Sequence, residues 1–489
     1  MADNTKIWPI FRSANWGLSD DLFTGIKNSF YYSNDMEIRE DAKSIYPKQA
    51  PRQWAKYDLW ARNVVWYCQA SRYFNWHWYV FTEKDVFKID TENEVATSLW
   101  VSSWISTEWI HDAELFNWYV YFSTWSHLYR ISQSAADANW ASAGNFTVMN
   151  LNSSSYHPLY ATDIMMVVGN GKEVSKVTKE VPDQVQAWIT LQDDYQVKFL
   201  NELWWFIRVI AEDWYYWAEL LLWDKVSSAA DEIIPMNWYK FLQSRIYNWY
   251  HYLLSNRWLW LINWYQFYIL KRMEELASYD RKENWMIVYD DKLYFVKSDW
   301  AYIYWAKNKN YNDVLNLWSA RYDDSWQPWA IATDWHTIIY SEWNKSWDVN
   351  PAHTYVYVRN PYTDDVSIYR WQNWEFQTMA YFGSSLSEIK QAMYLRVWYY
   401  IDSWYIKVYY RTEADVTSED PDDWNWHELT QDWWLWPNSD MRAPFATSLK
   451  LNCRFQRIQF KFVLNQSRSR SQPRTNLYSA DLYYNDMLD

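Results

Sequence analysis

The chain has 489 residues, and its 46 Lys and Arg against 60 Asp and Glu give a formal net charge of -14 and a pI near 5.1. This acidic balance argues against a general nucleic-acid or anionic-membrane binder, because such a protein carries a basic face. The N-terminus shows no basic region leading into an apolar stretch, and no window approaches the roughly 18 uninterrupted apolar residues of a spanning helix. We therefore expect a protein that is assembled in a cytoplasm and has no membrane partner.

Residues 1–55 form the first predicted part of the chain. They are polar and poor in strand patterns, and Pro9, Pro47 and Pro51 interrupt them. A segment of this kind buries little surface against itself. We expect an extended N-terminal arm that packs on another chain.

Residues 56–385 have the pattern of a succession of short β-strands, in which aromatic and β-branched runs flank turns as they do in hairpins. Because one hairpin cannot bury its own face whereas stacked blades can, the pattern predicts an all-β fold with a β-propeller of roughly six or seven blades. A pair of β-sandwiches is the competing all-β interpretation. The predicted hairpins join Tyr79–Thr82 to Val86–Ile89, Tyr119–Ser123 to His127–Ile131, Lys292–Val296 to Ala301–Tyr304, Ala330–Thr333 to Thr337–Tyr340, and Tyr355–Val358 to Val366–Tyr369.

Residues 386–489 contain longer strands. The runs Tyr405–Tyr410, Phe455–Phe462 and Leu477–Tyr484 alternate between the two faces of a strand, which suits a small C-terminal β-sandwich. The polar stretch Gln466–Arg474 is predicted to be one of its connecting loops.

Trp and Gly occur in inverted proportions. The chain has 42 Trp and 6 Gly, whereas an ordinary protein has about 7% Gly and few Trp. Many of these Trp follow Asn or Asp, where Gly would complete the strongest short hairpin signal because the turn needs φ > 0. The composition favours a gene whose own code reads UGA as glycine, with Trp written in its place. A genuinely Trp-rich, carbohydrate-stacking protein is the alternative.

The two interpretations predict different surroundings for Trp. If glycine is the natural residue, the Trp that follow Asn or Asp lie at hairpin tips and turn ends, many at φ > 0 and exposed to solvent. Trp426 is expected to be a true Trp whose ring packs against the C-terminal sandwich. The Trp that test the first prediction are Trp76, Trp118, Trp238, Trp285, Trp300, Trp335 and Trp374.

Segments at the two ends of the chain resemble one family. Trp16–Asp21 followed by Phe30–Asp41, together with the closing Ile458–Lys461 and Tyr478–Tyr484, are similar to the first and last parts of tailed-phage virion proteins. The resemblance implies an arm, a β-propeller and a C-terminal sandwich. It also implies a tail or neck component such as a nozzle, a hub or a portal-channel plug that stabilises packaged DNA, and it carries over no catalytic residues.

No catalytic, cofactor-binding or metal-binding residues are predicted. The motif Gly169–Lys172 lacks the spacing of a phosphate-binding loop and predicts a tight turn between two strands. The eight His show no metal-ligand spacing, the loop Glu419–Asp423 lacks that of an EF-hand, and no sialidase-type sequence box occurs. Cys68 and Cys453 lie far apart in sequence and are expected to be free, buried thiols.

The expected function is that of a non-enzymatic virion structural protein, located in the virion and assembled in the host cytoplasm. Its expected partners are other copies of itself and neighbouring tail or neck proteins. Arg468, Arg470 and Arg474 form a small basic loop that would suit contact with packaged DNA, although solvated charge is the simpler interpretation. The alternative function is a glycan-binding or glycan-cleaving propeller, which requires rows of true Trp or converging carboxylates.

Overall fold

The structure of the chain is a computed structural model. It describes residues 5–11, 30–34, 36–38, 45–47, 57–58, 68–83, 85–90, 95–99, 108–136, 146–152, 156–192, 194–213, 215, 217–236, 240–255, 258–263, 266–272, 286–289, 292–296, 300–306, 315–321, 326–333, 338–344, 354–359, 374–382, 388–400, 406–415, 425–430, 445–464 and 476–487.

Seven four-stranded antiparallel sheets contain all the strands that are described between residues 57 and 359. The first three sheets are β6 (Cys68–Phe74), β7 (His77–Thr82), β8 (Val86–Asp90) and β9 (Val95–Ser98); β10 (Ile110–Phe116), β11 (Tyr119–Thr124), β12 (His127–Ser132) and β13 (Thr147–Asn150), with helix α1 (Gln133–Ala136) after β12; and β14 (Leu159–Ala161), β15 (Met165–Asn170), β16 (Glu173–Thr178) and β17 (Gln186–Thr190). The other four are β18 (Gln196–Leu203), β19 (Phe206–Glu212), β20 (Ala218–Trp223) and β21 (Glu232–Pro235); β22 (Phe241–Tyr247), β23 (Tyr250–Ser255), β24 (Trp258–Asn263) and β25 (Gln266–Arg272); β26 (Met286–Tyr289), β27 (Lys292–Val296), β28 (Trp300–Ala306) and β29 (Leu315–Arg321); and β30 (Trp326–Thr333), β31 (Ile338–Asn344) and β32 (Thr354–Arg359) with β5 (Tyr57–Asp58).

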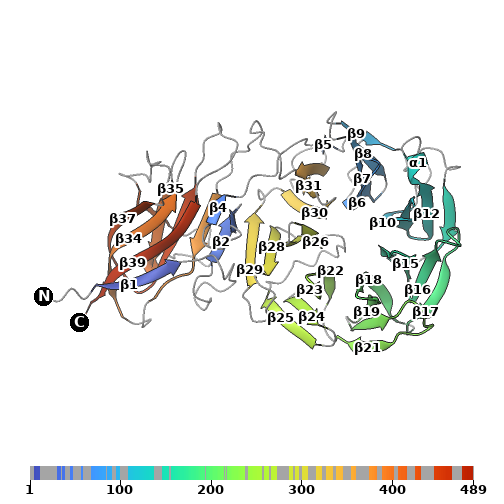
Figure 1. Ribbon diagram of the computed structural model, residues 1–489. Coiled ribbons are helices and arrows are strands. Elements are labelled where there is room, and N and C mark those ends of the chain that lie inside the picture. Colours follow the sequence, from blue (N-terminus) through green and yellow to red (C-terminus); the bar gives the residue numbers. More distant parts are fainter. Residues whose placement is uncertain are drawn as a thin grey trace. The chain divides into compact units, whose positions relative to one another are not determined.

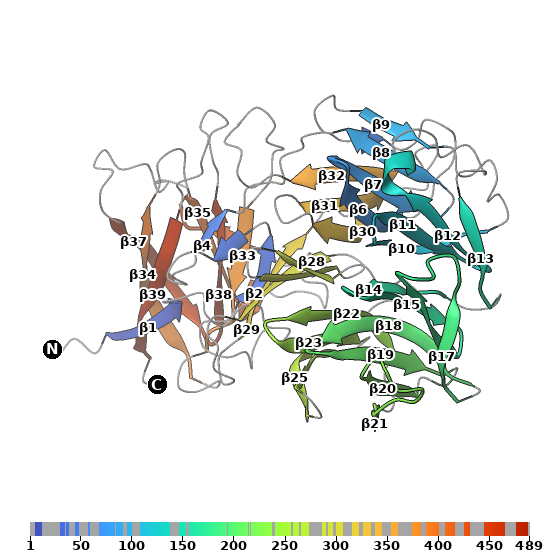
Figure 2. The ribbon, with the colours of Figure 1, turned by 45° about the vertical axis from the view of Figure 1, so that its right-hand side comes forward.

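These sheets are the blades of a closed β-propeller. The first strand of each blade contacts the first strand of the next, and β30 of the last blade contacts β6 of the first. Figure 1 shows the first strands facing the middle of the ring, and in the rotated view of Figure 2 the strands β18 to β21 follow one another outward. The last blade is completed by β5, which precedes the first blade in sequence and pairs with β32, Tyr57 lying opposite Val356. The predicted propeller is confirmed, with seven blades.

The second strand of each blade carries most of the core. β7, β11, β19 and β23 are buried along nearly their whole length, because neighbouring blades cover both faces of the sheet, and their sequences are correspondingly apolar. Tyr79, Tyr121, Tyr252 and Tyr294 are buried at the same register position of four blades. The core is thus built by repetition of one strand pattern around the ring.

The chain outside the propeller forms two further sheets. The six-stranded sheet contains β1 (Lys6–Phe11), β3 (Met36–Ile38), β4 (Ile45–Pro47), β34 (Lys390–Tyr400), β37 (Phe445–Phe455) and β39 (Asn476–Asp486). The five-stranded sheet contains β2 (Phe30–Asn34), β33 (Trp374–Thr378), β35 (Ile406–Thr412), β36 (His427–Glu428) and β38 (Ile458–Leu464), with the 3₁₀ helix η3 (Glu413–Asp415) after β35. Tyr381 joins the two sheets, because its backbone pairs with Ile458 of β38 while its hydroxyl hydrogen-bonds that of Tyr484 in β39 at 3.1 Å.

This sandwich corrects two expected boundaries. The described strands of residues 1–55 do not form a separate extended arm, because β1 to β4 pair within the two sheets of the chain's own sandwich. β1 contains Pro9, which is tolerated because β1 pairs on one side only, with β39. β33 was expected inside the propeller of residues 56–385 but pairs with β38. The C-terminal part of the sandwich therefore begins before residue 386.

Three blades share the same first turn. The turns Asn75–Trp76, Asn117–Trp118 and Asn248–Trp249 join the first strand to the second, and all six residues have φ between 47° and 67°. Positive φ at both central residues is the type I′ turn, whose second position strongly favours Gly. The three Trp side chains are 85%, 80% and 70% exposed.

A fourth blade has the related turn that also favours glycine. In the turn Trp204–Trp205, Trp204 has φ of 63°. Positive φ at the first central residue alone is the type II′ turn, in which that residue is ordinarily Gly. Gly171, which has φ of 66° between β15 and β16, shows the natural glycine in such a position. The tight turn predicted for Gly169–Lys172 is confirmed by the same two strands.

The structure describes some of the Trp whose surroundings were predicted from the sequence. Trp76 and Trp118 lie at hairpin tips as expected, and Trp249 behaves in the same way. Trp426 also meets its prediction, because its ring packs under the Arg411 and Lys461 side chains of the sandwich, at 4.4 Å and 4.8 Å from the ring centroid. Of the others, Trp300 and Trp374 begin strands, and Trp238, Trp285 and Trp335 lie outside the described residues.

Candidate functional site

The innermost strands of the propeller bring a set of polar side chains to one level of the ring. In each blade we call "axial" the residue of the first strand that lies three positions before the turn of the first hairpin. In the third blade this turn follows Thr162, whose backbone nitrogen donates to the Met165 carbonyl at 2.8 Å. Polar residues occupy this position in five consecutive blades, and an apolar residue follows in the sixth. The axial residues of blades one to six are Arg72, Glu114, Tyr160, Asn201, Arg245 and Ile287.

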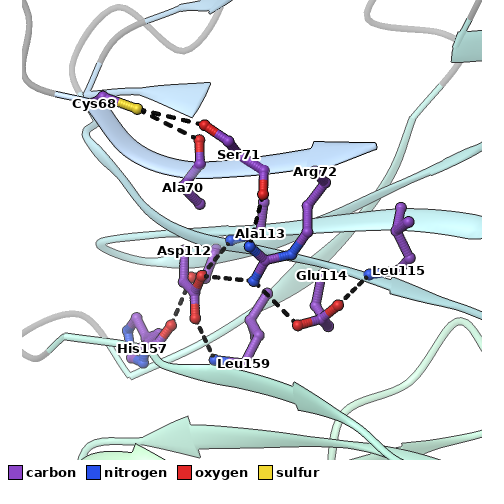
Figure 3. A network of polar contacts seen from close by, with 11 residues as sticks. Cys68, Ala70, Ser71, Arg72, Asp112, Ala113, Glu114, Leu115, His157 and Leu159 are labelled. Atoms are coloured by element: carbon purple, nitrogen blue, oxygen red, sulfur yellow. Dashed lines mark hydrogen bonds and ion pairs between the residues drawn. The ribbon is translucent and has the colours of Figure 1, made fainter. Parts of the chain in front are cut away.

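Arg72 connects the first blade to the second (Figure 3). Its Nη2 atom lies 3.1 Å from Glu114 Oε2 and 3.6 Å from Asp112 Oδ1, and its Nη1 donates to the Ser71 carbonyl at 2.9 Å. Burial alone would lower the pKa of Arg72, but Glu114 and Asp112 raise it above its ordinary value. The guanidinium therefore stays charged, held by two carboxylates of the neighbouring blade.

Asp112 extends this network to the third blade. Its side chain is buried and accepts hydrogen bonds from the backbone nitrogens of Ala113 at 2.7 Å and Leu159 at 2.9 Å. His157 is drawn in the same network (Figure 3), and its Nδ1 lies 2.9 Å from the Gly169 carbonyl. Burial lowers the pKa of His157, so its ring is neutral at pH 7. These contacts hold blades together, and none of them exposes a nucleophile or a base to solvent.

Arg245 has different surroundings although its register position is the same. It is exposed to solvent, and no hydrogen bond or ion pair joins its side chain to a residue that the structure describes. Desolvation lowers the pKa of Arg245, Tyr160 and Glu114 raise it, and Arg72 lowers it further. These three residues are the axial residues of the first three blades, and Arg245 holds the same register position in the fifth.

A buried polar seam joins the fourth and fifth blades next to Arg245. Asn201 Nδ2 donates to Ser244 Oγ at 2.7 Å, and Ser244 Oγ lies 2.7 Å from His251 Nε2. His251 is fully buried, and this desolvation, together with the positive charge of Arg208, lowers its pKa well below the ordinary value. The seam is neutral apart from Arg208 and positions the strand that carries Arg245.

One cluster contains the residue types of a hydrolase triad. Glu108 Oε1 lies 2.6 Å from His127 Nδ1, and Ser126 Oγ lies 2.9 Å from the same Nδ1 atom. Burial would raise the pKa of Glu108, but hydrogen bonds from Ser126 and Thr124 and the neighbouring His127 lower it. A triad needs the serine on one ring nitrogen and the carboxylate on the other. The cluster therefore fixes a turn and lacks the geometry of acyl transfer.

The residues singled out from the sequence have mixed outcomes. Cys68 and Cys453 are both free, Cys68 buried and Cys453 partly so. The loop Glu419–Asp423 and the basic stretch with Arg468, Arg470 and Arg474 lie outside the described residues. Within the described part of the chain, no group of three or more His, Cys, Asp or Glu is arranged to hold a metal ion. No helix among the described elements is long and apolar enough to cross a membrane.

The axial residues were missed from the sequence, although a signal exists. The same five-residue pattern, a charged residue, any residue, an aromatic residue, Asn and Trp, occurs three times, at Arg72–Trp76, Glu114–Trp118 and Arg245–Trp249. The Asn-Trp pair marks the turn. The charged residue, which comes two positions before the aromatic one, lies at the axial position. The turn alone was recognised, and the repeat that precedes it was not.

Comparisons with known proteins give a likeness of fold. No protein-family model and no curated protein sequence matches the chain. The Neurospora crassa Pan2 WD40 domain is similar at 9% identity over 61% of this chain and 90% of that one, with a TM-score of 0.41. The AfRom2 CNH domain has 6% identity over 61% and 96% of the two chains, with a TM-score of 0.41.

A bacterial structure is similar over a larger share of this chain. The extracellular domain of the putative hybrid two component system BT4673 from B. thetaiotaomicron has 8% identity over 73% of this chain and 46% of that one, with a TM-score of 0.44. At such low identities and TM-scores, no property of this chain is inferred from these structures. The propeller assignment itself rests on the seven sheets and their closure.

Proposed function

We propose that the chain is a non-enzymatic structural protein of a tailed-phage virion, an assembly component of the tail or neck that contacts copies of itself and neighbouring virion proteins. The observation that carries this proposal is the position of the segments that resemble such proteins. β2 and β3 come from the N-terminal segment and β38 and β39 from the C-terminal one, and all four belong to the two sheets of one sandwich. Segments separated by a whole propeller thus fold together, which supports a shared origin for both.

Purified particles test this proposal. We expect peptides of this chain to follow phage particles through a density gradient, at a constant ratio to the other virion proteins, and antibodies against it to label the tail or neck. A cytoplasmic host enzyme is the matched control and should stay at the top of the gradient. Recovery of the chain only with the soluble host proteins would contradict the proposal.

We further propose that Trp at the glycine-type turns stands where the natural protein has Gly. Trp76, Trp118 and Trp249 combine positive φ with almost complete exposure of a large apolar ring. The left-handed region costs a residue with a Cβ roughly 1–2 kcal/mol, and Gly avoids both this cost and the exposed ring. Four such turns in one ring are more simply explained by glycine codons than by four strained Trp.

Peptide masses of the natural protein decide this point. The tryptic peptide Ile246–Arg257 contains a single Trp, Trp249, at the second position of its turn. We expect its mass to be lower than the written sequence requires by the difference between Trp and Gly. The same peptide from a recombinant protein made in a host with the standard code is the control. An unchanged mass would show that position 249 is Trp.

The glycan-binding alternative depends on the same measurement. Trp204, Trp205 and Trp249 are exposed side by side, with ring centroids of Trp204 and its two neighbours 6.3 Å and 5.6 Å apart. Such a row suits stacking on sugar rings if the residues are Trp. If Ile246–Arg257 has the mass of the Trp form, quenching of Trp fluorescence by oligosaccharides becomes the next test. If it has the mass of the Gly form, the row does not exist in the natural protein.

A further inference from the structure

Arg72 and Arg245 are a matched pair, of which only Arg72 has an ionic partner among the described residues. Both are axial residues, and both lie opposite a buried tyrosine of the second strand, Tyr79 and Tyr252. The axial residue of the blade that follows Arg72 is Glu114, which binds its guanidinium at 3.1 Å. The repeated geometry therefore shows what an axial arginine meets when the next blade supplies a carboxylate.

Among the described residues, the blade that follows Arg245 supplies no carboxylate at the axial position. Its axial residue is Ile287, which is buried and apolar, and the first strands of these two blades are in contact. Arg245 makes no hydrogen bond or ion pair with any described residue, and it remains open to solvent. A planar guanidinium presents five N–H donors in a fixed arrangement that matches an oxyanion. At Arg245, which is exposed, these donors are accessible to solvent.

Tyr160 adds a second donor to the same level. Its pKa is raised by burial, and the charges of Arg245 and Glu202 act on it in opposite directions, so the hydroxyl keeps its proton at pH 7. The Glu202 backbone hydrogen bond acts to lower this pKa, which is the effect of an N–H that donates to the hydroxyl oxygen, so the O–H itself can still donate. Glu114, whose charge would repel an anion, is already bound to Arg72.

We infer that Arg245, assisted by Tyr160, binds an oxyanion, the carboxylate or phosphate group of a small molecule, at the middle of the propeller ring. The anion takes the place that Glu114 occupies for Arg72. Charge-assisted, bidentate hydrogen bonds of this kind are stronger than neutral ones and are favoured where water is partly excluded. The inference does not rest on the virion role, since it concerns the ring alone.

Titration calorimetry at low ionic strength tests the inference, with inorganic phosphate in one arm and succinate in the other. We expect saturable binding of at least one of them to the full chain, and binding at least tenfold weaker in Arg245→Gln. Arg454→Gln, which removes the same charge from an exposed strand of the sandwich, should bind like the unchanged protein. The arm that responds identifies carboxylate or phosphate as the preferred group.

Two results would overturn the inference. One is the absence of saturable heat with both anions, and the other is equal weakening in Arg245→Gln and Arg454→Gln, which would indicate general charge screening. Because Arg245 is exposed, its replacement is expected to leave the fold intact, and the circular dichroism spectrum checks this. Tyr160→Phe, which keeps the ring and removes the hydroxyl, should weaken binding less than Arg245→Gln does.

Discussion

Oδ2 of Asp112 lies 2.9 Å from the backbone nitrogen of Leu159, so that a side chain of the second blade holds the first strand of the third. Oδ1 of the same carboxylate accepts from the Ala113 nitrogen and faces Arg72 of the first blade. One buried side chain thus connects three consecutive blades. Contacts of this kind, repeated around a ring, make the blades depend on one another for stability.

Replacing Asp112 by Ala should destabilise the propeller strongly. The variant leaves two backbone donors and part of the Arg72 charge without an acceptor in a buried place, which costs about 3 kcal/mol of unfolding free energy. Urea denaturation measures the change. Asp163→Ala removes an exposed carboxylate from the turn after β14 and is the control, expected to change stability little. Equal unfolding free energies of the two variants would show that the Asp112 hydrogen bonds do not stabilise the propeller.

Replacing the turn Trp by Gly should stabilise a recombinant chain made with Trp. At Trp76, Trp118 and Trp249 glycine removes the steric cost that a Cβ has at positive φ. We expect the free energy of unfolding to rise by about 1 kcal/mol for each position, measured as a higher midpoint of urea unfolding. Trp223 is a control at which glycine should lower stability, since this Trp is fully buried and its Nε1 donates to the Ser227 carbonyl at 2.8 Å. Trp223→Gly should cost about 3–5 kcal/mol. A loss of stability at the three turns would refute the turn argument.

The stability of the protein should decrease on mild acidification. Burial holds the pKa of His251 well below its ordinary value and also lowers that of His157. The unfolded chain binds protons on these residues below a pH of about 6.5, whereas the native state does not. The contribution of these two His to stability is therefore fully present above that pH, and it is lost as the pH falls toward their pKa values in the folded state.

Urea midpoints between pH 7.5 and pH 5.0 measure this dependence. Each buried His contributes up to about 1.4 kcal/mol per pH unit below the unfolded pKa. His251→Gln should reduce the slope while His157 still contributes. A slope that is the same in the variant and the unchanged protein would exclude His251 as a source of the effect.

Both thiols should react slowly in the folded protein. Burial raises the pKa of Cys453 to about 11, so at pH 8 little of it is thiolate, which is the reactive form. Cys68 is buried against the first hairpin, with Sγ 3.7 Å from the Ala70 carbonyl. Ellman's reagent should therefore detect both thiols rapidly in urea and neither rapidly in buffer. Rapid labelling of Cys453 in buffer at pH 8 would contradict this assignment.

The sequence predicted those parts of the fold that depend on local pattern. The hairpins Tyr79–Thr82 with Val86–Ile89 and Tyr119–Ser123 with His127–Ile131 are confirmed because alternation and turn residues are encoded within a few positions. The partner expected for Tyr355–Val358, Val366–Tyr369, lies outside the described residues. Instead β32 pairs with β5, almost three hundred residues earlier in the chain.

Long-range pairings were not visible in the sequence. β1 and β4 are short strands that contain Pro9 and Pro47, and runs of this length interrupted by proline do not predict a sheet by themselves. They are stabilised as strands by β39, whose pairing nothing local announces. The axial site was missed for the same reason, because Arg72 and Glu114 are 42 residues apart and meet only when two blades stack.

Closure by β5, together with the N-terminal strands of the sandwich, sets an order of events during synthesis. Residues 6 to 58 leave the ribosome first, yet their partner strands β32, β33 and β39 are made after the blades have emerged. The strands β1, β2 and β5 must therefore remain without these partners until the later part of the chain has been translated. A truncated product that ends before β32 lacks the partner of β5 and carries exposed strand edges, and such edges pair with other chains. Incomplete translation is thus the condition under which this protein is most prone to aggregate.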